Sequence, residues 1–307
     1  SKEISLRLIT VYVSLTFFCA FFYKIFGMNF FDSLTHSMTT IATGGFSNYD
    51  QSIGYFNNPY IEITSIIFIL LGSIPFILYI KFISDDKKII FKDEQVKLFL
   101  KLTLVSILIL FFYLAVVNQN IFEIHLRSVI FNVVSILTGT GYVTKEFDQW
   151  GNFPLIFFLI LMFIGGCAGS TTCGIKIFRV HILYHFIRNQ LLKIIYPRAV
   201  INLKYNYNKV EDKLIASIIS FIYLYILIFF VLASLLTLTG LDFITSVSGA
   251  ASSLSNVGPG LGNEIGPNSN CSGLPDQSKW LLSVGMILGR LEIFAILIIF
   301  LPSFWRK

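Results

Sequence analysis

Charged residues are scarce in this sequence. Asp, Glu, Lys and Arg make up 13% of the 307 residues, whereas hydrophobic residues make up 55%, and the mean hydropathy is +0.76. A soluble domain carries about twice this charged fraction. The composition therefore excludes a soluble globular protein and predicts a polytopic membrane protein whose helices are surrounded largely by lipid.

Cysteines and catalytic motifs are equally sparse. The four cysteines, at positions 19, 167, 173 and 271, are scattered and show no metal-ligand spacing. The sequence has no Ser/His/Asp set, no paired carboxylates and no phosphate-binding Gly-Lys motif. We therefore expect no disulfide, no zinc site, no cofactor and no enzymatic activity.

The formal net charge of +6 comes from short basic segments between apolar runs. The N-terminal tail, residues 81–101, residues 176–213 and the C-terminal end hold 18 of the 23 basic residues. This distribution is typical of cytoplasmic loops in membrane proteins rather than of a nucleic-acid-binding surface. The pattern places both ends of the chain and the two basic segments on the cytoplasmic side of the membrane.

Long apolar runs define the expected membrane segments. A hydrocarbon core about 30 Å thick requires roughly 20 apolar residues in a helix. Five stretches are long enough or nearly so: residues 9–26, 61–82, 98–117, 214–238 and 281–300. A sixth run, residues 154–164, breaks at Gly165-Gly166 and resumes helical character near Ile175, as in a broken membrane helix. The fold class predicted is all-α.

Short helix-like runs that end in glycine-rich turns lie between these segments. Residues 31–43, 128–138 and 243–255 precede turns around Gly45, Gly141 and Gly258, which are 96 and 117 residues apart. The order of a helix, a half-helix, a glycine turn and a helix thus occurs three times. It predicts membrane-pore-membrane repeats with re-entrant pore loops, as in potassium channels.

Backbone carbonyl groups in such turns can replace the hydration shell of a cation. Glycine adopts positive φ angles easily, so successive carbonyl groups can face one axis. The alternative is ordinary close packing of glycine between membrane helices. The selectivity-filter interpretation predicts potassium binding by the backbone carbonyl groups of Thr43, Gly44, Gly45, Thr140, Gly141, Asn256, Val257 and Gly258.

Five motifs carry a family resemblance. They are HSMTTIATGGFSNYDQSIGYF (36–56), SILTGTGYVT (135–144), GGCAGSTTCGIKIFRV (165–180), SSLSNVGPGLG (252–262) and LGRLEIFAILIIFLPSFWR (288–306). Over essentially its whole length the chain resembles the TrkH family of potassium-translocating subunits, within the wider Trk/Ktr superfamily.

The resemblance implies four membrane-pore-membrane repeats around one pore. Residues 1–92, 93–200 and 201–307 match the second, third and fourth repeats, with Gly45, Gly141 and Gly258 at the filter glycine positions. The first repeat of the family has no counterpart here, and Ser1 falls where the second repeat would begin. We therefore expect a fragment with three of the four repeats.

Residues 165–176, GGCAGSTTCGIK, disfavour a helix interior and predict an intramembrane loop. The alternative is a helix that packs closely through its small residues. In proteins similar to TrkH, the corresponding loop blocks the pore below the filter. The resemblance thus implies a gate made of Gly165, Gly166, Gly169, Ser170, Thr171, Thr172, Gly174, Lys176 and Arg290.

Arg290 lies midway in the apolar run 281–300. A lipid-exposed charge there would cost at least a few kcal/mol, so the side chain is expected to face the pore or a protein partner. The alternative is a structural ion pair with Glu292. However, Glu292 is two positions from Arg290, and residues at this spacing do not lie on the same face of a helix. The family resemblance implies an arginine that opposes cation flow.

The function predicted is potassium uptake through a gated pore with a backbone-carbonyl selectivity filter. The alternative is a secondary, ion-coupled transporter with inverted repeats, which would show one or two central helix breaks and acidic coupling residues. The resemblance also implies a homodimer on a cytoplasmic ring of nucleotide-binding subunits resembling TrkA. The basic segments 81–101 and 176–213 are the surfaces available for that contact or for membrane lipid.

Overall fold

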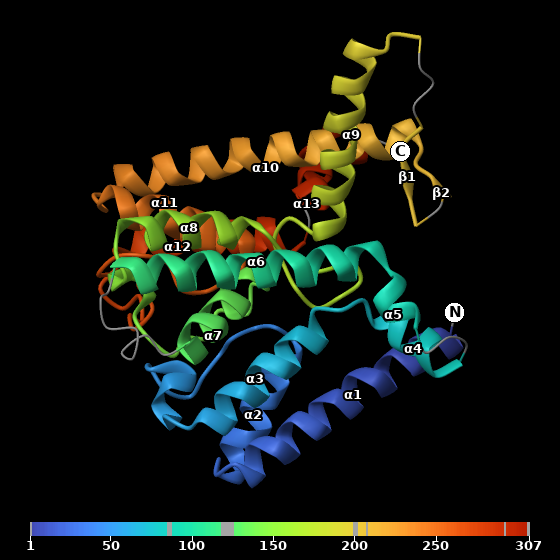
Figure 1. Ribbon diagram of the computed structural model, residues 1–307. Helices are drawn as coiled ribbons and strands as arrows, with labels where there is room; N and C mark the ends of the chain where they lie inside the picture. Colours follow the sequence, from blue (N-terminus) through green and yellow to red (C-terminus); the bar gives the residue numbers. More distant parts are fainter. Residues whose placement is uncertain are drawn as a thin grey trace.

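Three long helices that run in the same general direction frame the molecule (Figure 1). The structure, a computed structural model, describes residues 2–84, 88–117, 126–198, 202–206, 208–291 and 293–305. Helices α1 (Lys2–Ile25), α6 (Glu94–Val117) and α10 (Asp212–Leu238) are each long and apolar enough to cross a membrane. All three start at the same end of the molecule and run in the same direction (Figure 1).

A short helix follows each long one. Helices α2 (Phe30–Ile41), α7 (Leu126–Leu137) and α11 (Phe243–Ser255) have 12, 12 and 13 residues, too few to cross a bilayer. Asn29 caps the start of α2 and Asp242 caps the start of α11, each through its side-chain oxygen. Each short helix packs on the long helix before it and ends at a glycine-rich turn.

The third element in each set is an interrupted helix. Helices α3 (Pro59–Gly72) and α4 (Phe76–Ser84) meet at a bend of 86°. Helix α8 (Asn152–Phe163) is separated from α9 (Ile177–Ile195) by the break predicted at Gly165-Gly166. Helices α12 (Asp276–Arg290) and α13 (Ile293–Leu297) meet at 109°.

Two of these interruptions correct the sequence prediction, which treated residues 61–82 and 281–300 as continuous helices. Pro75 explains the first, because it has no N–H to donate and disfavours a helical conformation at Ile74. The second follows Arg290, so the guanidinium group sits at a helix end rather than in mid-span. A charge in mid-span would be costly in hydrocarbon.

The sets pack against one another in sequence order. Helix α3 packs against α7, and α8 packs against α11. Three buried hydrophobic clusters accompany them, one around α1 to α3, one around α6 to α8 and one around α10 to α12. Large apolar side chains on the long helices, such as Phe17, Phe112 and Phe230, remain more than half exposed, as expected of lipid-facing surfaces.

The remaining elements are short. They are η1 (Ser52–Phe56), α5 (Ile89–Lys92), η2 (Phe147–Gln149), β1 (Lys204–Tyr205), β2 (Asn208–Lys209), η3 (Ile298–Phe300) and α14 (Pro302–Trp305). The antiparallel hairpin β1–β2 departs from the all-α prediction. Asn206, with φ +44°, begins its turn and donates from its side-chain amide to Asp93 at 3.0 Å.

One end of the long helices collects the basic segments. The start of α1, helices α4 and α5, the hairpin β1–β2 and the C-terminal end all lie toward this end in Figure 1. Helix α9 projects away from the bundle (Figure 1). The molecule is thus a mostly helical membrane protein with one end rich in basic residues.

Candidate functional site

Three glycine turns share one backbone conformation. We define the first turn as residues 43–46, the second as 139–142 and the third as 256–259. Each has positive φ angles at two alternate positions: Thr43 (48°) and Gly45 (66°), Gly139 (70°) and Gly141 (82°), Asn256 (54°) and Gly258 (108°). A β-branched residue such as Thr43 seldom adopts this conformation, so the surrounding structure must hold it there.

The same backbone hydrogen bond ties each turn to its own short helix. In each case a backbone amide of the turn donates to the carbonyl group of the residue five positions earlier, in the short helix. The bonds join Gly44 to Thr39 (2.8 Å), Thr140 to Ser135 (2.9 Å) and Val257 to Ser252 (3.0 Å). The partly negative C-terminal end of each short helix therefore lies at its turn. Such an end favours a nearby cation.

Adjacent turns touch through their backbones. A Cβ atom added at Gly45 would lie 1.8 Å from the Thr140 carbonyl oxygen, and one added at Gly141 would lie 1.8 Å from the Val257 carbonyl oxygen. Both positions therefore require glycine. No atom of the described residues lies within 4 Å of a Cβ added at Gly258. The contacts run from the first turn to the second and from the second to the third.

A cavity of about 470 Å³ opens onto all three turns. Of the predicted filter residues, Gly44, Gly45, Gly141, Asn256, Val257 and Gly258 line it. Thr43 and Thr140 are buried behind it. The carboxylate residue Asp50 adds a negative charge to the lining. The structure thus brings all eight predicted filter residues together, with a carbonyl group of one turn against a glycine of its neighbour.

Residues 165–176, the intramembrane loop hereafter, leave α8 and return beside it. The Gly165 amide donates to the Ile175 carbonyl at 2.9 Å, and the Ile175 amide donates to the Phe163 carbonyl at 3.0 Å. A Cβ added at Gly165 would lie 1.9 Å from the Cys173 carbonyl oxygen. The predicted loop therefore closes on itself at its base, and Gly165 is needed for that close approach.

Thr171 joins the intramembrane loop to the first glycine turn. Its hydroxyl lies 2.9 Å from the Ile41 carbonyl oxygen and 3.1 Å from the Gly72 carbonyl oxygen. The Thr43 hydroxyl lies 3.2 Å from the same Thr171 oxygen. The loop thus contacts both the end of α2 and the bend after α3.

Other contacts place the loop against the rest of the bundle. The Phe76 amide donates to the Gly169 carbonyl at 3.0 Å, and the Ala168 amide donates to the Gln95 side chain at 2.8 Å. A Cβ added at Gly139 would lie 3.8 Å from the Cys173 nitrogen. The intramembrane loop therefore lies next to the second turn as well as the first.

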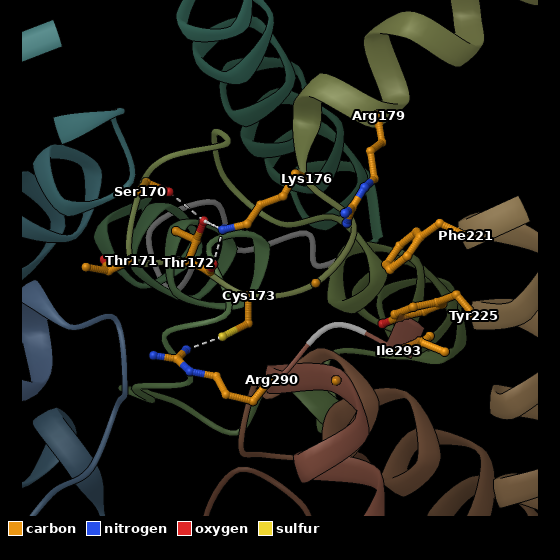
Figure 2. Close-up of a pocket in the computed structure, with 12 residues that line it drawn as sticks. Ser170, Thr171, Thr172, Cys173, Lys176, Arg179, Phe221, Tyr225, Arg290 and Ile293 are labelled. Atoms are coloured by element: carbon orange, nitrogen blue, oxygen red, sulfur yellow. Dashed lines mark hydrogen bonds between the residues drawn. The ribbon is translucent and has the colours of Figure 1, made fainter. Parts of the chain in front are cut away.

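A second cavity, of about 240 Å³, lies at the loop (Figure 2). Six of the predicted gate residues line it: Ser170, Thr171, Thr172, Gly174, Lys176 and Arg290. The other three, Gly165, Gly166 and Gly169, do not line it and instead pack within the loop or against Pro75. Lys176 bonds to Thr172, and the Arg290 guanidinium reaches the Cys173 sulfur (Figure 2).

The lining of this cavity is strongly basic. Lys176, Arg179 and Arg290 all contribute to it, and the Arg179 guanidinium carbon lies 3.7 Å from the centroid of the Phe221 ring. Arg290 thus lies at a cavity lined by polar and charged side chains, whereas its prediction to face the pore or a protein partner stays a prediction. Its predicted alternative partner, Glu292, lies outside the described residues.

Helix α12 connects Arg290 to the third glycine turn. The Asn256 side-chain amide donates to the Met286 carbonyl at 3.0 Å. A Cβ added at Gly289 would lie 1.9 Å from the Leu254 carbonyl oxygen. The sequence analysis did not single out Gly285 and Gly289, although two small residues four positions apart are a known signal for close helix packing. No sequence signal pointed to Cys173 as the contact of Arg290.

Known proteins match the chain over almost its whole length. The TrkH family model, described as a cation transport protein, matches residues 2–307. The chain is 40% identical over 300 residues to the Trk system potassium uptake protein TrkI of Halomonas elongata, covering 97% of this chain and 61% of TrkI. It is 34% identical over 305 residues to Trk system potassium uptake protein TrkH of Escherichia coli, covering 97% of this chain and 61% of that protein.

A solved structure is similar as well. The crystal structure of the potassium transporter TrkH from Vibrio parahaemolyticus matches with a TM-score of 0.92 at 34% sequence identity. The match covers 99% of this chain and 65% of that chain. The chain therefore spans about three fifths of the length of the curated relatives it matches.

Proposed function

Because the chain belongs to the TrkH family of cation transport proteins, we propose that it takes part in potassium uptake through a gated pore. The observation that carries the proposal is the direct backbone contact between the three glycine turns, each with the same pair of positive φ angles. Family members are transporters, not enzymes, which confirms the prediction of no enzymatic activity.

The glycine turns act as the selectivity filter. The Thr140 carbonyl of the second turn lies against Gly45 of the first, and the Val257 carbonyl of the third lies against Gly141 of the second. Together the carbonyl groups of the turns replace the hydration shell of a potassium ion. The C-terminal ends of α2, α7 and α11 stabilise the dehydrated cation through their partly negative ends. The potassium ion is the transported ligand, and its ligands are backbone oxygen atoms rather than side chains.

The intramembrane loop and Arg290 act as the gate. The loop lies against the helix end that carries the first turn, so it is placed to block an ion that leaves the filter. The basic side chains of its cavity repel cations. Opening requires the loop to move and Arg290 to leave the ion path.

The transport unit is a set of repeats. We assign residues 1–92, 93–200 and 201–307 to the second, third and fourth repeats of a TrkH-type pore, because the hydrogen bond from turn to short helix recurs in each. A closed ring needs a further turn against Gly258, where the described residues leave open space. We therefore propose that the ion path is enclosed by four turns: the three described here and one further turn.

An inverted-repeat secondary transporter is not favoured. Inverted repeats would make equivalent helices run in opposite directions. Helices α1, α6 and α10 instead run in the same direction (Figure 1), and the glycine turns lie together around one cavity. These features support repeats of equal orientation around a single path.

Location and partners follow from the basic end of the molecule. We place both ends of the chain on the cytoplasmic side of a bacterial inner membrane, because the basic segments gather at that end (Figure 1). The matched relatives are named as parts of Trk systems. We assign the chain to a homodimer on a nucleotide-binding ring resembling TrkA, with segments 81–101 and 176–213 as its contact surface.

Ion flux into liposomes tests the proposal. The full-length protein is reconstituted, and uptake of potassium, rubidium and sodium is measured down imposed gradients. We expect uptake of potassium and rubidium well above that of sodium, without a requirement for a second coupled ion. Equal uptake of sodium, or uptake that depends on a proton or sodium gradient, would contradict the pore.

A further inference from the structure

Tyr142 connects two glycine turns. It directly follows Gly141 in the second turn, yet its side chain is fully buried and reaches helix α2. Its single hydroxyl proton is shared between the His36 carbonyl oxygen at 3.1 Å and the Thr39 hydroxyl oxygen at 2.5 Å. The phenol of the second turn is therefore held by the short helix of the first.

Thr39 in turn holds the first turn. Its hydroxyl donates to the Phe46 carbonyl at 2.9 Å, and Phe46 directly follows Gly45. In the second turn, the equivalent Ser135 hydroxyl donates to the Tyr142 carbonyl at 2.7 Å. Tyr142 is thus fixed at its carbonyl by its own short helix and at its hydroxyl by the neighbouring one.

The hydroxyl network extends away from the turns. The Thr40 hydroxyl lies 3.4 Å from the Tyr142 oxygen and 2.8 Å from the Tyr23 hydroxyl, which also lies 2.8 Å from the Ser65 hydroxyl. Tyr23, Thr40, Ser65 and Tyr142 are all fully buried. Water does not replace a partner that is lost from this buried network, so removing one hydroxyl weakens the hold on its neighbours.

His36 orients the Tyr142 ring. The two rings are stacked with centroids 6.2 Å apart and an interplanar angle of 29°. The imidazole is held at both nitrogens, by the Asp32 carbonyl at 2.8 Å and by the Ser47 hydroxyl at 3.0 Å. The phenol therefore has a fixed direction as well as fixed hydrogen-bond partners.

This link has no counterpart at the equivalent positions of the other turns. Phe46 follows Gly45 and Pro259 follows Gly258, and neither side chain has a hydroxyl. The backbone contact between the second and third turns is as close as that between the first and second. The contact between the first and second turns is thus held by a side chain, Tyr142, in addition to the backbone.

We propose that the Tyr142 hydroxyl is a positioning group that fixes the separation of the first and second glycine turns and thereby sets the preference for potassium over sodium. The inference rests on the proposed potassium-selective filter. A turn released from α2 can move its carbonyl groups toward a smaller ion, which lowers the penalty for sodium. The fold remains, because the aromatic ring stays in place.

The test compares Tyr142→Phe with the parent in liposomes containing the full-length protein. We expect the ratio of potassium to sodium uptake to fall about fivefold, the effect of losing about one buried hydrogen bond. Tyr79→Phe is the matched control, because it removes a phenol hydroxyl that donates to the Leu71 carbonyl at 2.7 Å and not to a residue of a glycine turn or of α2.

Thr39 provides an independent variant if Tyr142→Phe does not insert. Thr39→Val removes the hydroxyl that bonds Tyr142 and is expected to lower the ratio, whereas Thr39→Ser retains the hydroxyl and is expected to preserve it. A lower melting temperature with an unchanged ratio in Tyr142→Phe and Thr39→Val would overturn the inference and leave a structural role. A parent that does not discriminate potassium from sodium would instead contradict the proposed function itself.

Discussion

The glycine turns and the intramembrane loop are both non-helical, glycine-rich segments, yet they are held in different ways. Each turn is tied by the same backbone hydrogen bond to its own short helix, and its neighbours touch it through carbonyl groups. The loop is attached by hydrogen bonds to several separate elements: one to Gln95 in α6 and several to the bend between α3 and α4, at Gly72, Ser73 and Phe76. A similar composition thus supports two different attachments.

This difference has a mechanical consequence. Moving one glycine turn would displace its neighbour, because their backbones are in contact. Releasing the loop from Thr43 and Ile41 requires only hydrogen bonds of about 1 kcal/mol each to exchange partners. The turns are therefore suited to a fixed coordination geometry, and the loop is suited to a switch between two positions.

Gly141→Ala is expected to have the largest effect. An alanine at φ +82° is strained by about 1 to 2 kcal/mol, and its Cβ would collide with the Val257 carbonyl oxygen. We expect loss of discrimination between potassium and sodium in liposome flux. The control is Gly27→Ala, because Gly27 also has a positive φ but has open space around it. Equal, mild effects of both changes would argue against contact between the turns as the basis of selectivity.

Arg290→Ala is expected to raise potassium flux. A guanidinium repels a potassium ion about 6 Å away by about 3 kcal/mol at an effective dielectric constant of about 20, so flux is expected to rise by tenfold or more. Rubidium uptake and the melting temperature in detergent are measured together. Lys279→Ala on the same helix is the control, since Lys279 pairs with Asp276 far along α12. A less stable protein without extra flux would indicate a structural arginine instead.

Thr171→Val is expected to raise flux by a smaller factor. The change keeps the shape of the side chain but removes the hydroxyl that contacts Ile41, Gly72 and Thr43. With that link weakened by about 1 kcal/mol, the loop should open about fivefold more often. Thr103→Val is the control, because the Thr103 hydroxyl bonds to the Phe99 carbonyl of its own helix. Closed-state flux unchanged from the parent would show that Thr171 does not hold the loop.

Asp148→Asn is expected to have the smallest effect, on stability rather than on flux. Asp148 packs near Gly266 beyond the third turn, and its Oδ1 is buried without a hydrogen-bond partner among the described residues. Burial raises the pKa of the Asp148 carboxyl above its ordinary value. The ionised form is therefore disfavoured in the folded state.

The sign of this pH dependence follows from the raised pKa. The penalty for the ionised carboxylate is fully present above the folded-state pKa and disappears as the pH falls below the ordinary value of about 3.9. Asp148→Asn should therefore raise the melting temperature at pH 8, and the difference from the parent should shrink toward pH 4. Asp276→Asn, which changes an exposed carboxylate, serves as the control. A constant difference across this range would contradict a buried ionised Asp148.

Much of the site was predictable because its signals are local. Gly45, Gly141 and Gly258 each follow a short helix-like run at a similar distance from its end. In the structure all three line one cavity. The break at Gly165-Gly166 was also predictable, since glycine and hydroxyl residues disfavour a helix interior. The bend at Pro75 was missed, because a proline within a long apolar run was read as part of the run.

Contacts between distant residues were not predictable in the same way. Tyr142 lies in a motif that the analysis quoted, but its partner Thr39 is 103 positions away, and no local pattern relates the two. The contact of Arg290 with Cys173 spans 117 positions. The potassium-selective filter and the gate remain proposals that the flux measurements above address.

By itself, the sequence determined that this chain is a membrane protein, where its long helices lie and which residues form glycine turns. These properties depend on hydrophobicity and on backbone angles within a few residues. Only the tertiary structure decided which turns touch, which side chains stand behind them and where the intramembrane loop is attached. Those contacts arise because α3 packs on α7 and α8 packs on α11, and the packing of helices depends on the shapes of surfaces assembled from residues far apart in the chain.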